Sequence, residues 1–96
     1  MIIIRDVFRM KFGKAKDVKA LMKESKEMMP ADAEIRVLFD LVGPSYTMVL
    51  ESTHKNLAEF EASMGTVFSN KDWQGWYARF MPLIEQSYRE IFTVME

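Results

Sequence analysis

The sequence predicts one α+β domain with a ferredoxin-like βαββαβ order: a four-stranded antiparallel sheet, both main helices on one face, and an extra short helix before the last strand. Three observations lead to this prediction. The chain has 96 residues, which favours a single domain over 1–96. The spacing of its apolar residues switches repeatedly between a period of two and a helical period. Glycine or proline stands at several of the switches.

The first period-two segment indicates a strand over residues 2–12, which ends at Gly13. A helical stripe of apolar residues follows over 14–29. Pro30 is expected to end this helix, because proline lacks the backbone N–H that a helix interior needs.

The second and third strands are predicted over residues 35–42 and 46–51. The Gly43-Pro44 turn separates them, so we expect an antiparallel hairpin.

The second half of the chain predicts two more helices and a last strand. Residues 52–53 are candidate N-caps for a helix whose apolar stripe runs from Leu57 to about Phe68. Asp72 is a candidate cap for the short helix, which Pro82 closes. The last strand is predicted over residues 86–95.

The two faces of the predicted sheet differ in composition. We expect the apolar face to lie under the helices: Ile2, Ile4, Phe8, Met10, Ile35, Val37, Phe39, Leu41, Tyr46, Met48, Leu50, Tyr88, Phe92 and Val94. The other face mixes charged and aliphatic side chains, chiefly Ile3, Arg5, Val7, Arg9, Arg36, Leu38, Asp40, Val42, Val49, Glu51, Arg89 and Ile91. The solvent face of an antiparallel sheet is normally polar, and a large exposed aliphatic patch marks an interaction site. We therefore predict that these residues form a two-fold interface with a second copy of the chain.

The charges on the mixed face admit two interpretations. Four arginines meet two carboxylates there, and an ion-pair network that sets the register of the dimer is favoured. The alternative is a site for an anion, because the arginine fork suits bidentate recognition of a carboxylate.

Composition excludes several classes of function. The formal net charge is −1 and basic residues are dispersed, unlike the basic patch of a nucleic-acid-binding protein. The chain contains no cysteine, so disulfides and zinc–thiolate sites are absent. The apolar runs are too short to cross a bilayer, and the N-terminus lacks a signal-peptide pattern. We expect a cytoplasmic protein without a metal, a cofactor or a membrane partner.

Two titratable residues are candidates for catalysis. Alternation places Asp6 on the apolar face, where a carboxylate must be paired or protonated, so it is a candidate acid or base. The favoured alternatives are structural: a bond to a tyrosine, a pair with a helix lysine, or a bulge that turns Asp6 outward. His54 is the only histidine, but its predicted position at a helix start favours a surface role.

Aromatic residues before the last strand are candidates for a ligand pocket. The predicted pocket residues are Met64, Trp73, Trp76, Tyr77, Phe80 and Tyr88. Aromatic side chains line many small-molecule sites, but most of this group is expected to be core or interface.

Several loose motifs carry a resemblance to a known superfamily: Lys11-Phe12-Gly13-Lys14-Ala15, Glu51-Ser52, Leu57-Ala58-Glu59-Phe60, Trp73-Gln74-Gly75-Trp76 and Pro82-Leu83-Ile84. With the order of elements, they make the whole chain resemble the dimeric α+β barrel superfamily, especially small proteins related to antibiotic-biosynthesis monooxygenases and NIPSNAP-like proteins. The resemblance implies a homodimer with a ligand cavity between sheet and helices or near the dimer interface. It does not extend to the haem-degrading members, because Arg5 and Asp6 replace their first-strand Asn and no His follows Trp73.

Three functions follow as hypotheses, and whether the chain is an enzyme stays open. The first is a homodimer that binds a small apolar or aromatic molecule. The second is a cofactor-independent monooxygenase or isomerase of the antibiotic-biosynthesis type. The third is a structural or interaction module without a ligand.

Overall fold

The computed structural model describes residues 1–29 and 34–96, so the expected helix end at Pro30 lies outside the described residues. Four strands form one antiparallel sheet: β1 (Ile2–Met10), β2 (Ile35–Phe39), β3 (Thr47–His54) and β4 (Ile84–Thr93). Their order across the sheet is β2-β3-β1-β4, which places the first and third strands of the chain at the centre. The predicted α+β, ferredoxin-like fold is confirmed.

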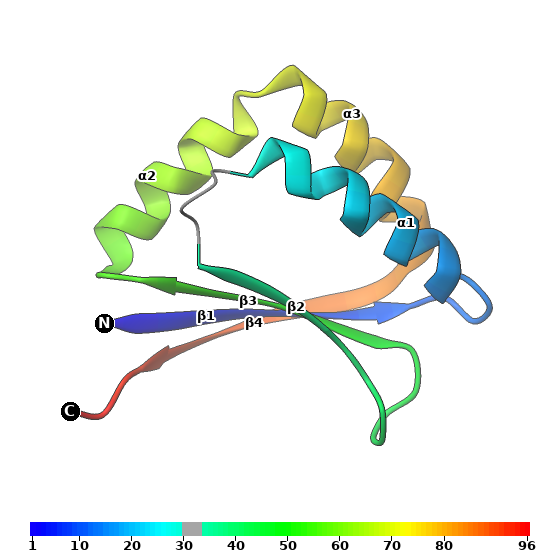
Figure 1. Ribbon diagram of the computed structural model, residues 1–96, viewed down its shortest axis with the longest axis horizontal. Coiled ribbons are helices and arrows are strands. Elements are labelled where there is room, and N and C mark those ends of the chain that lie inside the picture. Colours follow the sequence, from blue (N-terminus) through cyan, green and yellow to red (C-terminus); the bar gives the residue numbers. More distant parts are fainter. Residues whose placement is uncertain (30–33) are drawn as a thin grey trace.

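The helices cover a single face of this sheet (Figure 1). They are α1 (Ala15–Ser25), α2 (Leu57–Phe68) and α3 (Lys71–Phe80), with 3-10 turns at Lys26–Met28 and Met81–Leu83. None of the helices in the described parts of the chain is long and apolar enough to cross a membrane. The helix predicted as short, α3, has 10 residues against 11 in α1, and together with α2 it forms an arch over the sheet.

The core between sheet and helices has two parts. The larger part lies under α1 and α3 and contains Met10, Val18, Met22, Met48, Trp76 and Phe80. The smaller contains Ile2, Ile4 and Phe60 of α2, with Met64 packed against it. Side-chain hydrogen bonds join α1 to α3: Trp76 Nε1 donates to the Leu21 carbonyl at 2.7 Å, and both Nη atoms of Arg79 donate to the Glu24 carboxylate. The hydrogen bond from Arg79 lowers the pKa of Glu24.

The hairpin between β2 and β3 departs from the prediction. The strand predicted to reach Val42 ends at Phe39, because the Asp40 carboxylate accepts the Thr47 N–H at 2.9 Å and closes the ladder. Leu41 and Val42 therefore lie in the turn and are 96% and 94% exposed, so the expected strand positions of Leu41, Asp40 and Val42 are wrong.

The start of α2 is also different. β3 continues to His54, and the N-cap is Asn56, whose side chain accepts the Glu59 N–H at 2.9 Å. Residues 52–53 are therefore strand residues. α3 begins in the same way, with Asn70 rather than Asp72 as its cap. Asparagine is among the preferred N-cap residues because its short side chain satisfies a free helix N–H.

The faces of β4 are the reverse of those predicted. Arg89 pairs with Asp6 and Ile91 with Ile4, so Arg89 and Ile91 face the helices. Tyr88 pairs with Val7, which places it on the face away from the helices, and Phe92 lies on that face too.

An irregularity in the pairing explains the reversal. Met10 pairs with Ile84 and Arg9 with Gln86, so Glu85 is an extra residue in β4. A bulge of one residue moves every following side chain to the other face. Ile84 and Ile91 thereby both face the helices, although they are seven positions apart and regular alternation would put them on opposite faces.

We predict that Met48→Ala lowers the free energy of unfolding by about 2–5 kcal/mol, because the side chain is fully buried under the helices and its removal leaves a cavity. The matched control is Met81→Ala, since Met81 is half-exposed and its truncation should change stability by less than about 0.5 kcal/mol. Chemical denaturation measures both. Equal effects of the two substitutions would contradict the described core.

Candidate functional site

An ion pair lies on the helix face of the sheet, between the two parts of the core. Arg89 Nε of β4 donates to Asp6 Oδ1 of β1 at 2.6 Å, and Nη2 donates to Oδ2 at 3.4 Å. The Asp6 side chain is 20% exposed and that of Arg89 is 45% exposed. The partner of Asp6 is therefore a strand arginine, not one of the tyrosines or helix lysines considered from the sequence. A guanidinium aligned in this way satisfies the charge of a half-buried carboxylate.

Phe60 of α2 brings two further polar groups into the same region. The Arg89 guanidinium carbon lies 5.0 Å from the centre of the Phe60 ring, a cation–π distance. The His54 ring lies 5.0 Å from the same centre, edge to face. His54 Nε2 is 2.9 Å from Ser52 Oγ. His54 is thus a half-buried residue at the end of β3, not a surface residue at a helix start.

The predicted aromatic pocket is divided by the fold. Trp76 and Phe80 are buried in the larger core, where their rings stack 4.9 Å apart. Trp73 and Tyr77 are more accessible and stack at 4.8 Å, and Phe68 of α2 contacts Trp73 at 4.9 Å. These three rings make a partly exposed aromatic series, which we call the α3 series.

Two residues of the predicted pocket lie elsewhere. Met64 packs against the smaller core beside Phe60. Tyr88 projects from the opposite face of the sheet and cannot line the same pocket, because of the β4 bulge.

The face of the sheet away from the helices, called the open face, carries the charges and aliphatic residues of the predicted interface. Glu51 of β3 accepts from Arg36 of β2 and lies 3.7 Å from Arg5 Nε of β1. The bond to Glu51 raises the pKa of Arg36. Arg5 Nε is buried and has no hydrogen-bond partner within the described residues. The network predicted from the sequence thus contains Glu51 and two of the four arginines, while Arg89 belongs to the other face.

Apolar side chains surround this network on the open face. Leu38, Tyr88 and Phe92 are exposed there, and Val7 is covered between its neighbours on β3 and β4.

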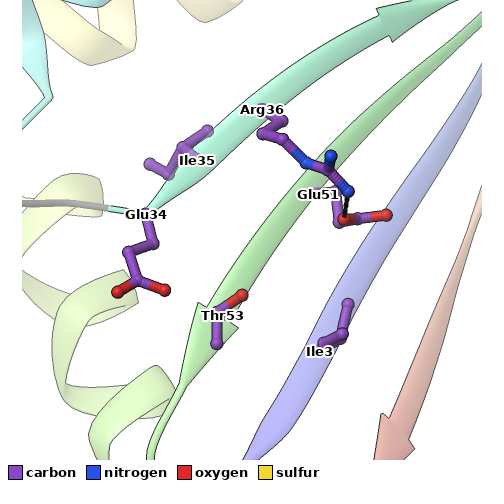
Figure 2. A pocket seen from close by; sticks show the side chains of 6 residues that line it. All are labelled: Ile3, Glu34, Ile35, Arg36, Glu51 and Thr53. Atoms are coloured by element: carbon purple, nitrogen blue, oxygen red, sulfur yellow. Dashed lines mark hydrogen bonds and ion pairs between the residues drawn. The ribbon is translucent and has the colours of Figure 1, made fainter.

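A shallow depression lies at one end of the open face (Figure 2). Its volume is about 340 Å³, and its lining is Ile3, Glu34, Ile35, Arg36, Glu51 and Thr53. Within residues 1–29 and 34–96, no group of three or more His, Asp or Glu side chains is arranged to hold a metal ion.

Solved structures share the fold over the full length of the chain. A NIPSNAP family protein from Agrobacterium tumefaciens has a TM-score of 0.90 at 19% identity, with 99% of this chain and 93% of that chain covered. An uncharacterised NIPSNAP domain protein from Burkholderia xenovorans has a TM-score of 0.90 at 14% identity, with 99% and 95% covered. A candidate antibiotic biosynthesis monooxygenase from Nitrosomonas europaea has a TM-score of 0.77 at 14% identity, with both chains fully covered.

These likenesses establish the fold, which is the one that the resemblance of the sequence implies. At such identities they do not transfer an activity. No protein-family model and no curated protein matches the sequence.

Sequence reasoning missed Arg89 as the partner of Asp6, and Phe60 as the ring between Arg89 and His54. One signal was present: a carboxylate among apolar residues requires a cation. Arg89 can supply it only if the odd-numbered residues of the last strand face the helices. The odd spacing of Ile84 and Ile91 also indicates a break in alternation.

We predict a favourable coupling of about 0.5–1 kcal/mol between Asp6 and Arg89, a modest value because Arg89 is largely solvated. A double-mutant cycle of Asp6→Asn and Arg89→Gln, followed by chemical denaturation, measures this coupling. The coupling should fall as salt is added. A coupling of zero at low salt would contradict a net contribution of the pair to stability.

Proposed function

We propose that the protein is a homodimer that binds a small aromatic or apolar molecule, with the protomers joined through the open faces of their sheets. The observation that carries the dimer is the exposure of Leu38, Tyr88 and Phe92 beside the Glu51 network. Exposed apolar residues on both outer strands of one open face favour burial against a partner. A two-fold pairing of identical surfaces is the commonest arrangement that provides it.

The residues that β4 places on the open face support the proposed dimer more strongly than the residues predicted there from the sequence. Tyr88 and Phe92 replace Arg89 and Ile91 on the open face, so two aromatic rings stand where a charge and an aliphatic were expected. Aromatic residues are enriched at the centres of protein interfaces.

The side chains of β4 that point toward the helices support the proposal of a ligand site. Ser87, Arg89 and Ile91 point toward the helices but are exposed, so the helices leave this strip of the sheet accessible. Phe60 lies beside Arg89, and Phe80 contacts Phe8, the neighbour of Ser87 across the strands. An apolar wall with one ion pair resembles the lining of small-molecule sites, in which a few polar groups orient the ligand.

The α3 series supports an aromatic ligand in particular. Phe68 and Tyr77 are exposed rings in stacking contact with Trp73. A planar ligand could extend this series by offset stacking, which contributes about 0.5–1.5 kcal/mol per ring pair.

A cofactor-independent monooxygenase is the second candidate, favoured by the Nitrosomonas europaea neighbour. In this chain Asp6 would accept a proton from the substrate. The carboxylate is already engaged by Arg89, so the reaction would require the substrate to displace the guanidinium. The ion pair therefore favours binding over catalysis, and an interaction module without a ligand is the third possibility.

We expect the wild-type protein to be dimeric at micromolar concentration in light scattering, and Tyr88→Glu or Phe92→Glu to make it monomeric. Each substitution places two carboxylates across the two-fold interface, while the half-exposed site tolerates it within the protomer. Leu57→Glu is the matched control, because Leu57 is equally exposed but lies at the start of α2. A monomeric wild-type protein would refute the dimer.

We expect aromatic fragments to bind near Tyr77 when a fragment panel is screened by NMR. Tyr77→Ala should weaken the aromatic hits by about two- to tenfold, whereas Tyr88→Ala, on the other face, should leave them unchanged. Screening aliphatic and aromatic fragments together tests the preference for rings. The ligand site would be wrong if no fragment bound at millimolar concentration, or if binding depended on Tyr88 instead.

A further inference from the structure

The turn between β2 and β3 presents two aliphatic side chains to solvent. Leu41 and Val42 are 96% and 94% exposed. Their turn is nevertheless fixed at its base: the Thr47 N–H donates to Asp40 at 2.9 Å, and the Thr47 hydroxyl donates to the Pro44 carbonyl at 2.8 Å. A constrained turn with an apolar tip is suited to insert into a surface, because little conformational entropy is lost on contact.

The direction of this turn is defined by the sheet. In Figure 1 the hairpin curves away from the helices and projects beyond the sheet on the open side. It is therefore continuous with the face that we propose as the dimer interface. A second copy packed on that face would lie directly beside the tip.

The depression in Figure 2 lies on the same face, at the opposite end of the hairpin strands. Ile3 and Thr53 are paired across β1 and β3 and lie side by side in the view. Arg36, whose side chain is 70% exposed, stands at the edge. The depression thus combines aliphatic surface with the Arg36–Glu51 ion pair and the carboxylate of Glu34.

Symmetry connects the tip to the depression. Two identical sheets can pack face to face about an axis that runs across the strands or along them. An axis across the strands places the tip of one protomer over the far end of its partner's β2 and β3, where the depression lies. An axis along the strands places the tip over the start of the partner's β4, where Gln86 is the residue on the open face. An aliphatic tip favours the first arrangement, because the far end of β2 and β3 offers it the aliphatic side chains of Ile3 and Ile35.

We propose that the Leu41–Val42 tip of each protomer inserts into the depression lined by Ile3, Arg36 and Thr53 of a second copy. This contact, which we call the clasp, forms twice in the dimer. This inference rests on the proposed homodimer and specifies its two-fold axis. The occupant of the depression is then the second copy, and a small molecule in its place is the competing outcome.

The chain contains no cysteine, so engineered disulfides test the clasp directly. Two variants carry Thr53→Cys with either Val42→Cys or Leu41→Cys, and each single-cysteine variant is a control. Within one protomer, Thr53 lies five residues beyond Met48, at the far end of β3 from the turn. That separation is roughly 16 Å, well beyond the ~7 Å that a disulfide spans, so any bond between the two positions joins two chains.

The expected result is a cross-linked dimer on a non-reducing gel for at least one double variant, and none for the single variants, after mild oxidation. Light scattering of the reduced samples establishes separately whether the protein is dimeric. A reduced dimer that no double variant cross-links would overturn the clasp and leave the proposed dimer standing. Cross-linking by Leu41→Cys or Val42→Cys alone would place the two tips together and also overturn it. A monomer would refute both proposals.

A second measurement does not depend on disulfide geometry. The double substitution Leu41→Ser with Val42→Ser should raise the dissociation constant of the dimer at least about tenfold in analytical ultracentrifugation. It should leave the unfolding of the protomer unchanged, because both side chains are solvated within it. An unchanged dissociation constant would contradict the clasp.

Discussion

The pairing of β4 with β1 decides which side chains each face of the sheet carries. Side chains alternate along a strand, so the single extra residue at Glu85 moves Arg89 to the helix face and Tyr88 to the open face. Asp6 gives this register a physical basis, since its carboxylate lies among apolar neighbours and requires the guanidinium opposite. The alternative register would place Tyr88 in the position of Arg89 opposite Asp6 and would leave the carboxylate without a cation.

The two proposed roles, a ligand site on the helix face and a dimer interface on the open face, follow from that register. On the helix face, Asp6 and Arg89 interrupt the apolar core and add one polar pair to an accessible strip beside Phe60 of α2. On the open face, aromatic and aliphatic residues surround Glu51, whose ion pairs link three strands. The first arrangement suits a ligand and the second suits a second copy of the chain.

Much of the fold could be predicted because apolar periodicity records which face of an element is buried. The strand over Ile2–Met10, where only Asp6 interrupts the apolar alternation, and the helix over Leu57–Phe68 are examples. The errors arose where side-chain hydrogen bonds or a bulge overrode the pattern, at Asp40, Asn56 and Glu85. The contacts of Phe60 with Arg89 and His54 join separate elements, so local spacing carried no information on them.

Fluorine NMR of the protein labelled with 3-fluorotyrosine tests the central claim, that the open face is buried against a second copy. The chain has three tyrosines, of which Tyr88 lies on the open face and Tyr77 on α3. With a soluble gadolinium complex as relaxation agent, Tyr88 should be protected at high protein concentration and become accessible on dilution, while Tyr77 stays accessible throughout. A Tyr88 signal as accessible as that of Tyr77 at every concentration would contradict the account.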